Sequence, residues 1–375
     1  MIFSTNADLG FEASKNDPKG FKPFASHREI LDYIQKYAKA NDLEKYIRFN
    51  TSVQKVVKKA GKWQVTVDQI DREKGEERWY TEEFDAVFVA SGRGSIPYVP
   101  EVEGLKGFAS RNPDVILHAK AFRNTDDFKG KKVLVVGSGI SALDISQYLI
   151  AAADRTIMSF DSADTVVPHQ VYQWTHDILS DNSIPFDRYP KIKRYLDDDG
   201  VEFVDGKIER GFDKIILATG YHLYQPFLDF PGNKPVTTNT RPNGPLKRLQ
   251  NLYLYSFTVG DPTLAYTSIS NNPYFFPLGE SIATMVSGVW SGHSKLPAVE
   301  VQQEWADKNL PDRKEQEALF KEDHFLQVVG EMFKLAPEGR TSVTDRIKKG
   351  ENEETKEVMK ELFYKFSKGE LREEA

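Results

Sequence analysis

The sequence of 375 residues contains no cysteine. This absence excludes disulfide bonds, iron–sulfur clusters, zinc sites with thiolate ligands and a cysteine nucleophile, and we predict no metal site. A large excess of one charge is also missing, because 56 acidic residues are balanced by 50 basic ones. A formal net charge of −6 gives no basic surface for DNA or RNA, so we expect no nucleic acid partner.

Long apolar runs are absent as well. No stretch approaches the ~20 continuous apolar residues of a transmembrane segment, and no basic segment followed by an apolar one indicates a signal peptide. We therefore expect a soluble, cytoplasmic protein. The chain does contain 39% hydrophobic and 12% aromatic residues, which suffice for a sizeable core. Its length predicts about two domains.

Hydrophobic periodicity predicts alternating strands and helices. Ser26 and Glu29 form a capping-box pattern ahead of apolar residues at helical spacing, and that helix is expected to end near Asn41. Strands are predicted at 47–57, 62–70, 84–90, 132–136, 155–160 and 214–218, with a charged hairpin loop at 71–78. Several of these strands are nearly continuous apolar runs, which is typical of parallel sheets buried on both faces. Further helices are expected from residue 297 onward.

The strand predicted at 132–136 runs directly into a glycine-rich turn and then into an amphipathic helix. The turn consists of Gly137, Ser138, Gly139, Ile140, Ser141 and Ala142. Gly137 permits a tight turn, Gly139 lets the backbone approach a pyrophosphate, and Ala142 keeps the helix close to the strand. The helix N-terminus offers free N–H groups to a phosphate. This pattern favours dinucleotide binding over an ordinary tight turn.

The end of the following strand bears on which nicotinamide coenzyme binds. An acidic residue there holds a ribose 2′-hydroxyl, whereas a basic residue receives the 2′-phosphate of NADP. Asp161 follows the first glycine at close to the usual interval of about 20 residues. It argues mildly against NADP, and a solvated loop residue is an equally weighted interpretation. Arg155 is a candidate phosphate partner but stands at the strand start, the wrong end.

Two further turns follow predicted buried strands. One contains Ser91 and Gly92, and the other contains Thr219, Gly220 and Tyr221. A turn of small residues ending in glycine allows close backbone approach. Two such turns suggest two nucleotide-binding sheets, although each alone could be a plain packing turn.

Taken together, these residues resemble the flavin-containing monooxygenases in their fungal-like form, of the dimethylaniline monooxygenase type. The matching stretches are 26–33, 84–92, 118–122, 137–145, 218–221, 226–228, 261–266, 289–292 and 296–297, and they span most of residues 1–300. The resemblance implies an α/β fold with two dinucleotide-binding, Rossmann-like domains. Residues 1–125 and 226–375 would form a discontinuous FAD-type domain with a helical C-terminal part, and residues 126–225 an inserted NADP-binding domain.

The resemblance also implies the cofactors FAD and NADP and an oxidoreductase activity. In that family NADPH reduces the flavin, oxygen adds to give a hydroperoxyflavin, and a soft nitrogen or sulfur atom of a small molecule is oxygenated. Asn6, in the pair Thr5-Asn6, matches the residue whose amide lies against the reactive flavin edge, and is the implied catalytic residue. The alternatives are a non-catalytic NAD(P)-binding protein and a Baeyer–Villiger-type monooxygenase.

One departure from the family concerns the first Gly-x-Gly-x-x-Gly, which holds the FAD pyrophosphate. It is expected some tens of residues before Thr5, and the chain begins at Met1. We therefore expect a member that lacks this N-terminal βαβ unit and binds FAD poorly. The substrate and the oligomeric state do not follow from the sequence.

Overall fold

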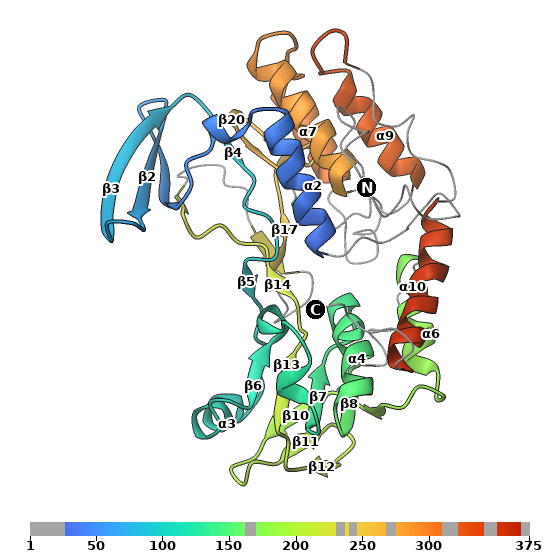
Figure 1. Ribbon diagram of the computed structural model, residues 1–375. Coiled ribbons are helices and arrows are strands. Elements are labelled where there is room, and N and C mark those ends of the chain that lie inside the picture. The colour runs from blue at the N-terminus through green and yellow to red at the C-terminus, as the bar shows by residue number, and fades with distance from the viewer. Residues whose placement is uncertain are drawn as a thin grey trace. The chain divides into compact units, whose positions relative to one another are not determined.

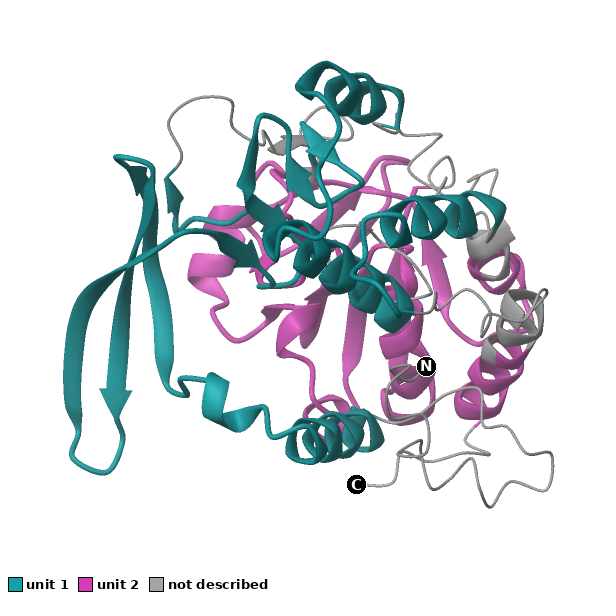
Figure 2. Ribbon diagram, turned by 90° about the horizontal axis from the view of Figure 1, so that it is seen from above, with its two compact units in different colours: residues 1–92, 224–238, 248–349 teal, residues 93–223, 239–247, 350–375 magenta. Residues whose placement is uncertain are grey.

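The computed structural model describes residues 27–161, 170–229, 237–239, 246–267, 275–309, 322–340 and 351–368. The chain divides into two compact units, which Figure 2 draws in two colours. Unit 1 comprises residues 1–92, 224–238 and 248–349, and unit 2 comprises residues 93–223, 239–247 and 350–375. Sheets and helices alternate within the chain, which confirms the α/β fold class. The predicted extent of the NADP-binding domain, residues 126–225, stays a prediction.

Unit 1 contains a first sheet of four strands in the order β15-β1-β2-β3, of which Figure 1 labels β2 and β3. Its strands are β1 (Thr51–Lys59), β2 (Lys62–Asp71), β3 (Glu76–Phe84) and β15 (Leu228–Asp229). β1, β2 and β3 pair antiparallel, and β15 lies parallel to β1. Alternation along β2 buries Trp63 and Val67, and the Trp63 indole N–H donates to Thr263 Oγ1 at 2.9 Å.

The second sheet of unit 1 has the order β18-β19-β20-β4. Its strands are β18 (Leu252–Tyr253), β19 (Phe257–Thr258), β20 (Asp261–Tyr266) and β4 (Val87–Val89), and β20 runs parallel to β4. The helices of this unit are α2 (His27–Ala40), η2 (Glu44–Tyr46), α7 (Phe275–Trp290), α8 (Val299–Lys308) and α9 (Glu322–Phe333). Phe257 and Ala265 of this sheet share one core with Met285 of α7 and Phe325 of α9.

Unit 2 is built on a five-stranded sheet in the order β6-β13-β7-β8-β9, in which every pairing is parallel. The strands are β6 (Ile116–His118), β7 (Lys132–Val136), β8 (Arg155–Ser159), β9 (Asp187–Tyr189) and β13 (Lys214–Leu217). Val133 and Val135 belong to the core on one face, and Leu134 belongs to the core on the other. The apolar run of β7 therefore reflects burial on both faces, as the sequence predicts.

Helices cover one face of this sheet (Figure 1). α4 (Ile140–Ala152) connects β7 to β8, α6 (Gln170–Ser180) lies between β8 and β9 in the chain, and α10 (Glu351–Ser367) packs against both helices. The rings of Tyr148 and Phe366 lie 4.9 Å apart, and Tyr364 donates to Asp181. The C-terminal helix is thus part of unit 2.

Short elements complete unit 2: β5 (Ile96–Pro97), α3 (Leu105–Arg111), η3 (Ala119–Ala121), η4 (Asp126–Phe128), β10 (Ile192–Tyr195), β11 (Val201–Phe203), β12 (Ile208–Glu209) and β14 (Tyr221–His222). The strands β16 (Thr237–Asn239) and β17 (Leu246–Leu249) each contain residues of both units. β10, β11 and β12 form a small antiparallel sheet whose apolar residues join α3 in covering the second face of the parallel sheet. Among the described helices, none has the length and apolar character to span a bilayer.

Two expectations for the segment 71–90 are wrong. β3 begins at Glu76, inside the predicted loop, and the predicted strand 84–90 is divided between the end of β3 and the three-residue strand β4. β3 is an edge strand with mostly exposed side chains. Charged residues flank its Trp79, Tyr80 and Phe84, so these aromatic residues form neither a continuous apolar run nor a regular alternation. The buried strands predicted at 132–136, 155–160 and 214–218 agree with the structure to within one residue.

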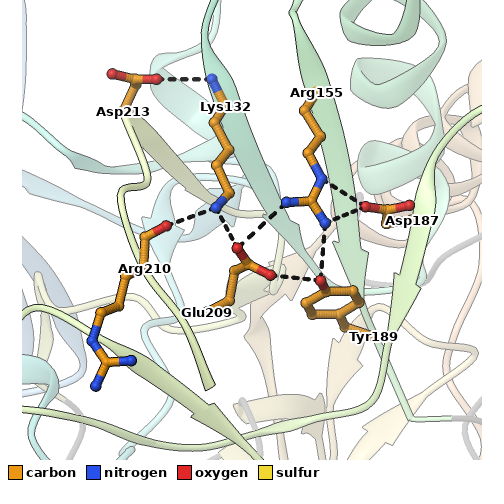
Figure 3. A network of polar contacts seen from close by, with 7 residues as sticks. All are labelled: Lys132, Arg155, Asp187, Tyr189, Glu209, Arg210 and Asp213. Atoms are coloured by element: carbon orange, nitrogen blue, oxygen red, sulfur yellow. Dashed lines mark hydrogen bonds and ion pairs between the residues drawn. The ribbon is translucent and has the colours of Figure 1, made fainter. Parts of the chain in front are cut away.

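Charged side chains form a network of hydrogen bonds and ion pairs near the amino ends of the strands of the parallel sheet (Figure 3). Glu209 is the centre of this amino-end network: it contacts Lys132 Nζ, lies 3.4 Å from Arg155 Nη1, and accepts from the Tyr189 hydroxyl at 2.7 Å. Arg155 Nε also donates to Asp187 Oδ2 at 2.7 Å. Burial raises the pKa of Glu209, but the hydrogen bonds from Lys132 and Tyr189 outweigh it and lower the pKa to about 2.

Candidate functional site

The glycine-rich turn lies where the strand order of the parallel sheet reverses. β7 is followed along the chain by α4 and β8 on one side, whereas its other neighbour, β13, comes much later. Ligands of open α/β sheets bind outside the carboxyl ends of the strands at such a switch point. The turn that begins at Gly137 follows the carboxyl end of β7, so the topology places it in that crevice.

Gly137 makes the turn possible because no other residue fits its surroundings. Its φ is +131°, and a Cβ built on it would lie 2.5 Å from the carbonyl oxygen of Ala218. The Gly137 N–H donates to the Ser159 carbonyl at 2.9 Å. This glycine is therefore used to bring β7, β8 and β13 together, and its amide is not offered to a ligand.

Gly139 is different, because its surroundings are open. It caps α4 with φ −78° and ψ 176°, and a Cβ there would meet no atom within 4 Å. The first hydrogen bonds of the helix run from the N–H groups of Ala142 and Leu143 to the Gly139 carbonyl. The amides of Ile140 and Ser141 precede those bonds at the positive end of the helix, and both residues are exposed. The turn thus presents backbone donors to open space, as a pyrophosphate requires.

The remaining residues of this turn, Ala142, Ser138 and Ile140, are also consistent with a phosphate-binding turn. Ala142 is fully buried in the core between helix and sheet, so a small residue keeps α4 close to β7. Ser138 is half-buried, and Ile140 is 42% exposed despite being apolar. An exposed isoleucine at the opening of the helix leaves an apolar surface beside the free amides.

The turn of Thr219, Gly220 and Tyr221 lies beside the glycine-rich turn, since it follows β13, the neighbour of β7. The Thr219 hydroxyl donates to the Tyr98 carbonyl at 2.5 Å, and the Tyr98 N–H donates to the Gly220 carbonyl at 2.9 Å. Gly220 has a φ of +87°, which favours glycine. Tyr221 pairs with Pro97 in the strands β5 and β14. The structure therefore brings two of the three predicted turns together within unit 2.

His118 holds this second turn, and the sequence did not show that role. Its Nδ1 accepts from the Lys120 N–H at 3.1 Å, which leaves the proton on Nε2 to donate to the Gly220 carbonyl at 3.0 Å. Burial lowers the pKa of His118, so the ring is neutral near pH 7 and suited to this bond. The imidazole also packs edge-on against Tyr221, with ring centroids 5.1 Å apart.

The third predicted turn, Ser91 and Gly92, belongs to unit 1. It follows β4, and Gly92 has a φ of +73°. Beside β4, the end of β20 carries hydroxyl groups in apolar surroundings: Tyr266 OH and Thr267 Oγ1 are buried without a hydrogen-bond partner among the described residues. Burial raises the pKa of the Tyr266 phenol. Unsatisfied buried hydroxyls at the carboxyl end of a parallel strand pair fit a site for a polar ligand.

Asp161 and Arg155 lie at opposite ends of β8. Arg155 belongs to the amino-end network (Figure 3), whereas the glycine-rich turn follows the carboxyl end of the neighbouring strand β7. Asp161 follows the carboxyl end and forms an ion pair with Lys191, a residue the sequence analysis missed. Its signal would have been a basic residue after the strand next to β8, but β9 is too short to be recognised from periodicity. Asn6 lies outside the described residues.

Comparisons with known proteins agree with this geometry. Residues 14–180 match the family described as flavin-binding monooxygenase-like. The chain is 29% identical over 312 residues to the flavin-containing monooxygenase iboF of Amanita muscaria and 30% identical over 295 residues to the trimethylamine monooxygenase of Roseovarius sp.. The chain belongs to the flavin-containing monooxygenase family. These alignments include 73% and 78% of the chain, which spans 57% and 58% of the relatives' own lengths.

The fold of this flavin-containing monooxygenase family member has solved counterparts. The crystal structure of Tmm from Pelagibacter sp. strain HTCC7211 superimposes with a TM-score of 0.69 at 22% identity, covering 98% of this chain and 74% of that one. At 22% identity, this structural similarity shows a shared fold and nothing about individual residues. The sequence similarity to the curated monooxygenases confirms the family membership predicted from the motifs, whereas the roles of the individual site residues stay predictions.

Proposed function

We propose that this chain binds NADPH at the glycine-rich turn and acts as a flavin-dependent monooxygenase on soft nitrogen or sulfur atoms of small molecules. The observation that carries the proposal is the turn of residues 137–142, whose open Gly139 and free helix amides lie at the switch point of a parallel sheet. The names of the relatives support the reaction class, because they include monooxygenases and one that acts on trimethylamine.

The residues of unit 1 fit a second cofactor, FAD. The turn of Ser91 and Gly92 follows β4, and the unsatisfied hydroxyls of Tyr266 and Thr267 lie at the end of the neighbouring parallel strand. When bound, the flavin would supply the oxygen-activating chemistry, and this chain's residues would bind and orient it and exclude water. The role of Asn6 against the flavin stays a prediction.

The proposal is tested on the purified chain in three measurements. Titration calorimetry with NADPH is expected to show binding, and visible absorbance of the protein supplied with FAD reports whether flavin is held. NADPH consumption is then compared with a tertiary amine, a thioether and a cyclic ketone under oxygen. We expect turnover with the amine or the thioether. A preference for the ketone would indicate a Baeyer–Villiger-type enzyme, and NADPH binding without flavin or turnover would indicate a non-catalytic nucleotide-binding protein.

A further inference from the structure

Hydrogen bonds fix the carboxyl ends of three neighbouring strands at one edge of the sheet in unit 2. The Gly137 N–H after β7 donates to Ser159 at the end of β8 at 2.9 Å. The Ser159 hydroxyl donates in turn to the carbonyl of Pro190, the residue after β9, at 2.8 Å. The Phe160 N–H donates to the Tyr189 carbonyl at 3.1 Å. The residues that follow β8 and β9 therefore leave the sheet side by side, next to the glycine-rich turn.

Asp161 and Lys191 are the charged residues at these two exits, and they form an ion pair. The backbone of Lys191 is anchored, because its carbonyl accepts from the Val204 N–H at 3.0 Å. The Lys191 side chain is 53% exposed and that of Asp161 is 23% exposed. The ammonium group is thus held near the strand end but remains within reach of a ligand.

The chemistry of this pair matches the one position at which NADPH differs from NADH. In a nucleotide-binding sheet of this topology, the residue at the end of the second strand faces the adenosine ribose. A carboxylate accepts hydrogen bonds from a 2′-hydroxyl and repels a 2′-phosphate, whereas an ammonium group pairs with the phosphate. Asp161 alone would therefore favour NADH, and Lys191 supplies the cation that NADPH needs.

We propose that the Asp161–Lys191 pair reads the 2′ substituent of the adenosine ribose. Lys191 pairs with the 2′-phosphate of NADPH, and Asp161 accepts from the 2′-hydroxyl of NADH. The inference rests on the proposed function, since it requires the coenzyme pyrophosphate at the glycine-rich turn. It assigns coenzyme preference to two residues that meet only because β8 and β9 are neighbours.

Calorimetric titration of the full chain with NADPH and with NADH tests this assignment. Lys191→Gln is expected to weaken NADPH binding about tenfold and to change NADH binding less than about twofold, because a charge-assisted contact is lost only with the phosphate. Asp161→Asn is expected to shift the NADPH-to-NADH affinity ratio in the opposite direction. Lys191→Arg retains the cation and should keep the NADPH affinity. Adenosine 2′,5′-bisphosphate and AMP repeat the comparison without the nicotinamide.

The exposed pair of Asp126 and Lys129 ahead of β7 provides the control. Asp126→Asn and Lys129→Gln remove the same charges from the same unit, away from the carboxyl edge, and should leave both affinities unchanged. An unchanged affinity ratio in both Asp161→Asn and Lys191→Gln overturns this inference while the proposed function stands. Failure of the unaltered chain to bind either coenzyme overturns the proposed function and this inference with it.

Discussion

The two ends of the parallel sheet in unit 2 differ in the chemical groups that they present: paired side chains at one end and backbone groups at the other. Near the amino ends of β7, β8 and β9, the paired side chains of the network around Glu209 satisfy one another (Figure 3). At the carboxyl ends, the chain presents glycines and backbone amides, and Gly139 faces open space. The two ends therefore have different roles. Side-chain pairing at the amino ends stabilises the sheet, and the exposed backbone at the carboxyl ends can bind a ligand.

The same division exists within the glycine-rich turn itself. Gly137 fits tightly against Ala218, whereas Gly139 has no neighbour that a Cβ would meet. The first glycine therefore serves the fold, and the second serves binding. Substitutions that change stability and coenzyme affinity separately test both distinctions.

The largest effect is expected for Gly137→Ala. A Cβ at φ +131° would lie 2.5 Å from the Ala218 carbonyl oxygen, so the strand ends must move apart. We expect the free energy of unfolding in urea to fall by about 2–4 kcal/mol. Gly139→Ala is the matched control: because alanine is a poorer N-cap than glycine, it should lower stability by only about 1 kcal/mol, but it should weaken NADPH binding at least about tenfold by occupying the pyrophosphate's space.

Either of two results would contradict this distinction between the glycines. If Gly137→Ala unfolds at the same urea concentration as the unaltered chain, then the close approach to Ala218 does not constrain the turn. If Gly139→Ala binds NADPH with unchanged affinity, then Gly139 does not approach the pyrophosphate and the proposed site is wrong.

A smaller loss of stability is expected at the amino ends of the strands. Glu209→Gln removes the negative charge between Lys132 and Arg155, which are 20% and 39% exposed. Lys132 then loses its carboxylate partner, and Arg155 keeps only Asp187. We expect a loss of about 1–3 kcal/mol in urea unfolding. NADPH affinity should stay within about twofold, because the network lies at the far end of the strands from the turn.

Asp198→Asn is a suitable control for this substitution. Asp198 forms an exposed ion pair with Arg210, so its loss should cost less than about 0.5 kcal/mol. An effect of Glu209→Gln on NADPH affinity larger than on stability would show that the two ends of the sheet are not independent.

The parts of this molecule that the sequence predicts well are those with strong local signals. β7 and α4 are found where they were expected, because the apolar run of 132–136 is buried on both faces and Gly137 marks the turn. β3 was missed because an exposed edge strand needs no regular alternation of apolar and polar residues. The contacts of His118 with Gly220 and of Lys191 with Asp161 were not predictable, since strand order brings these distant residues together.

Acidification should weaken the amino-end network selectively. The pKa of Glu209 is lowered to about 2 in the folded chain, against an ordinary value of 4.5. A carboxylate whose pKa is lowered on folding stabilises the fold fully at pH values above its unfolded pKa, and this contribution is lost as the pH falls from about 4.5 toward 2.

The stability difference between the unaltered chain and Glu209→Gln should therefore shrink over that pH range, as urea unfolding at pH 6, 4 and 3 would show. A difference that grows on acidification would mean that Glu209 is held in its neutral form, and the contrast between a charged amino end and an open carboxyl end would fail.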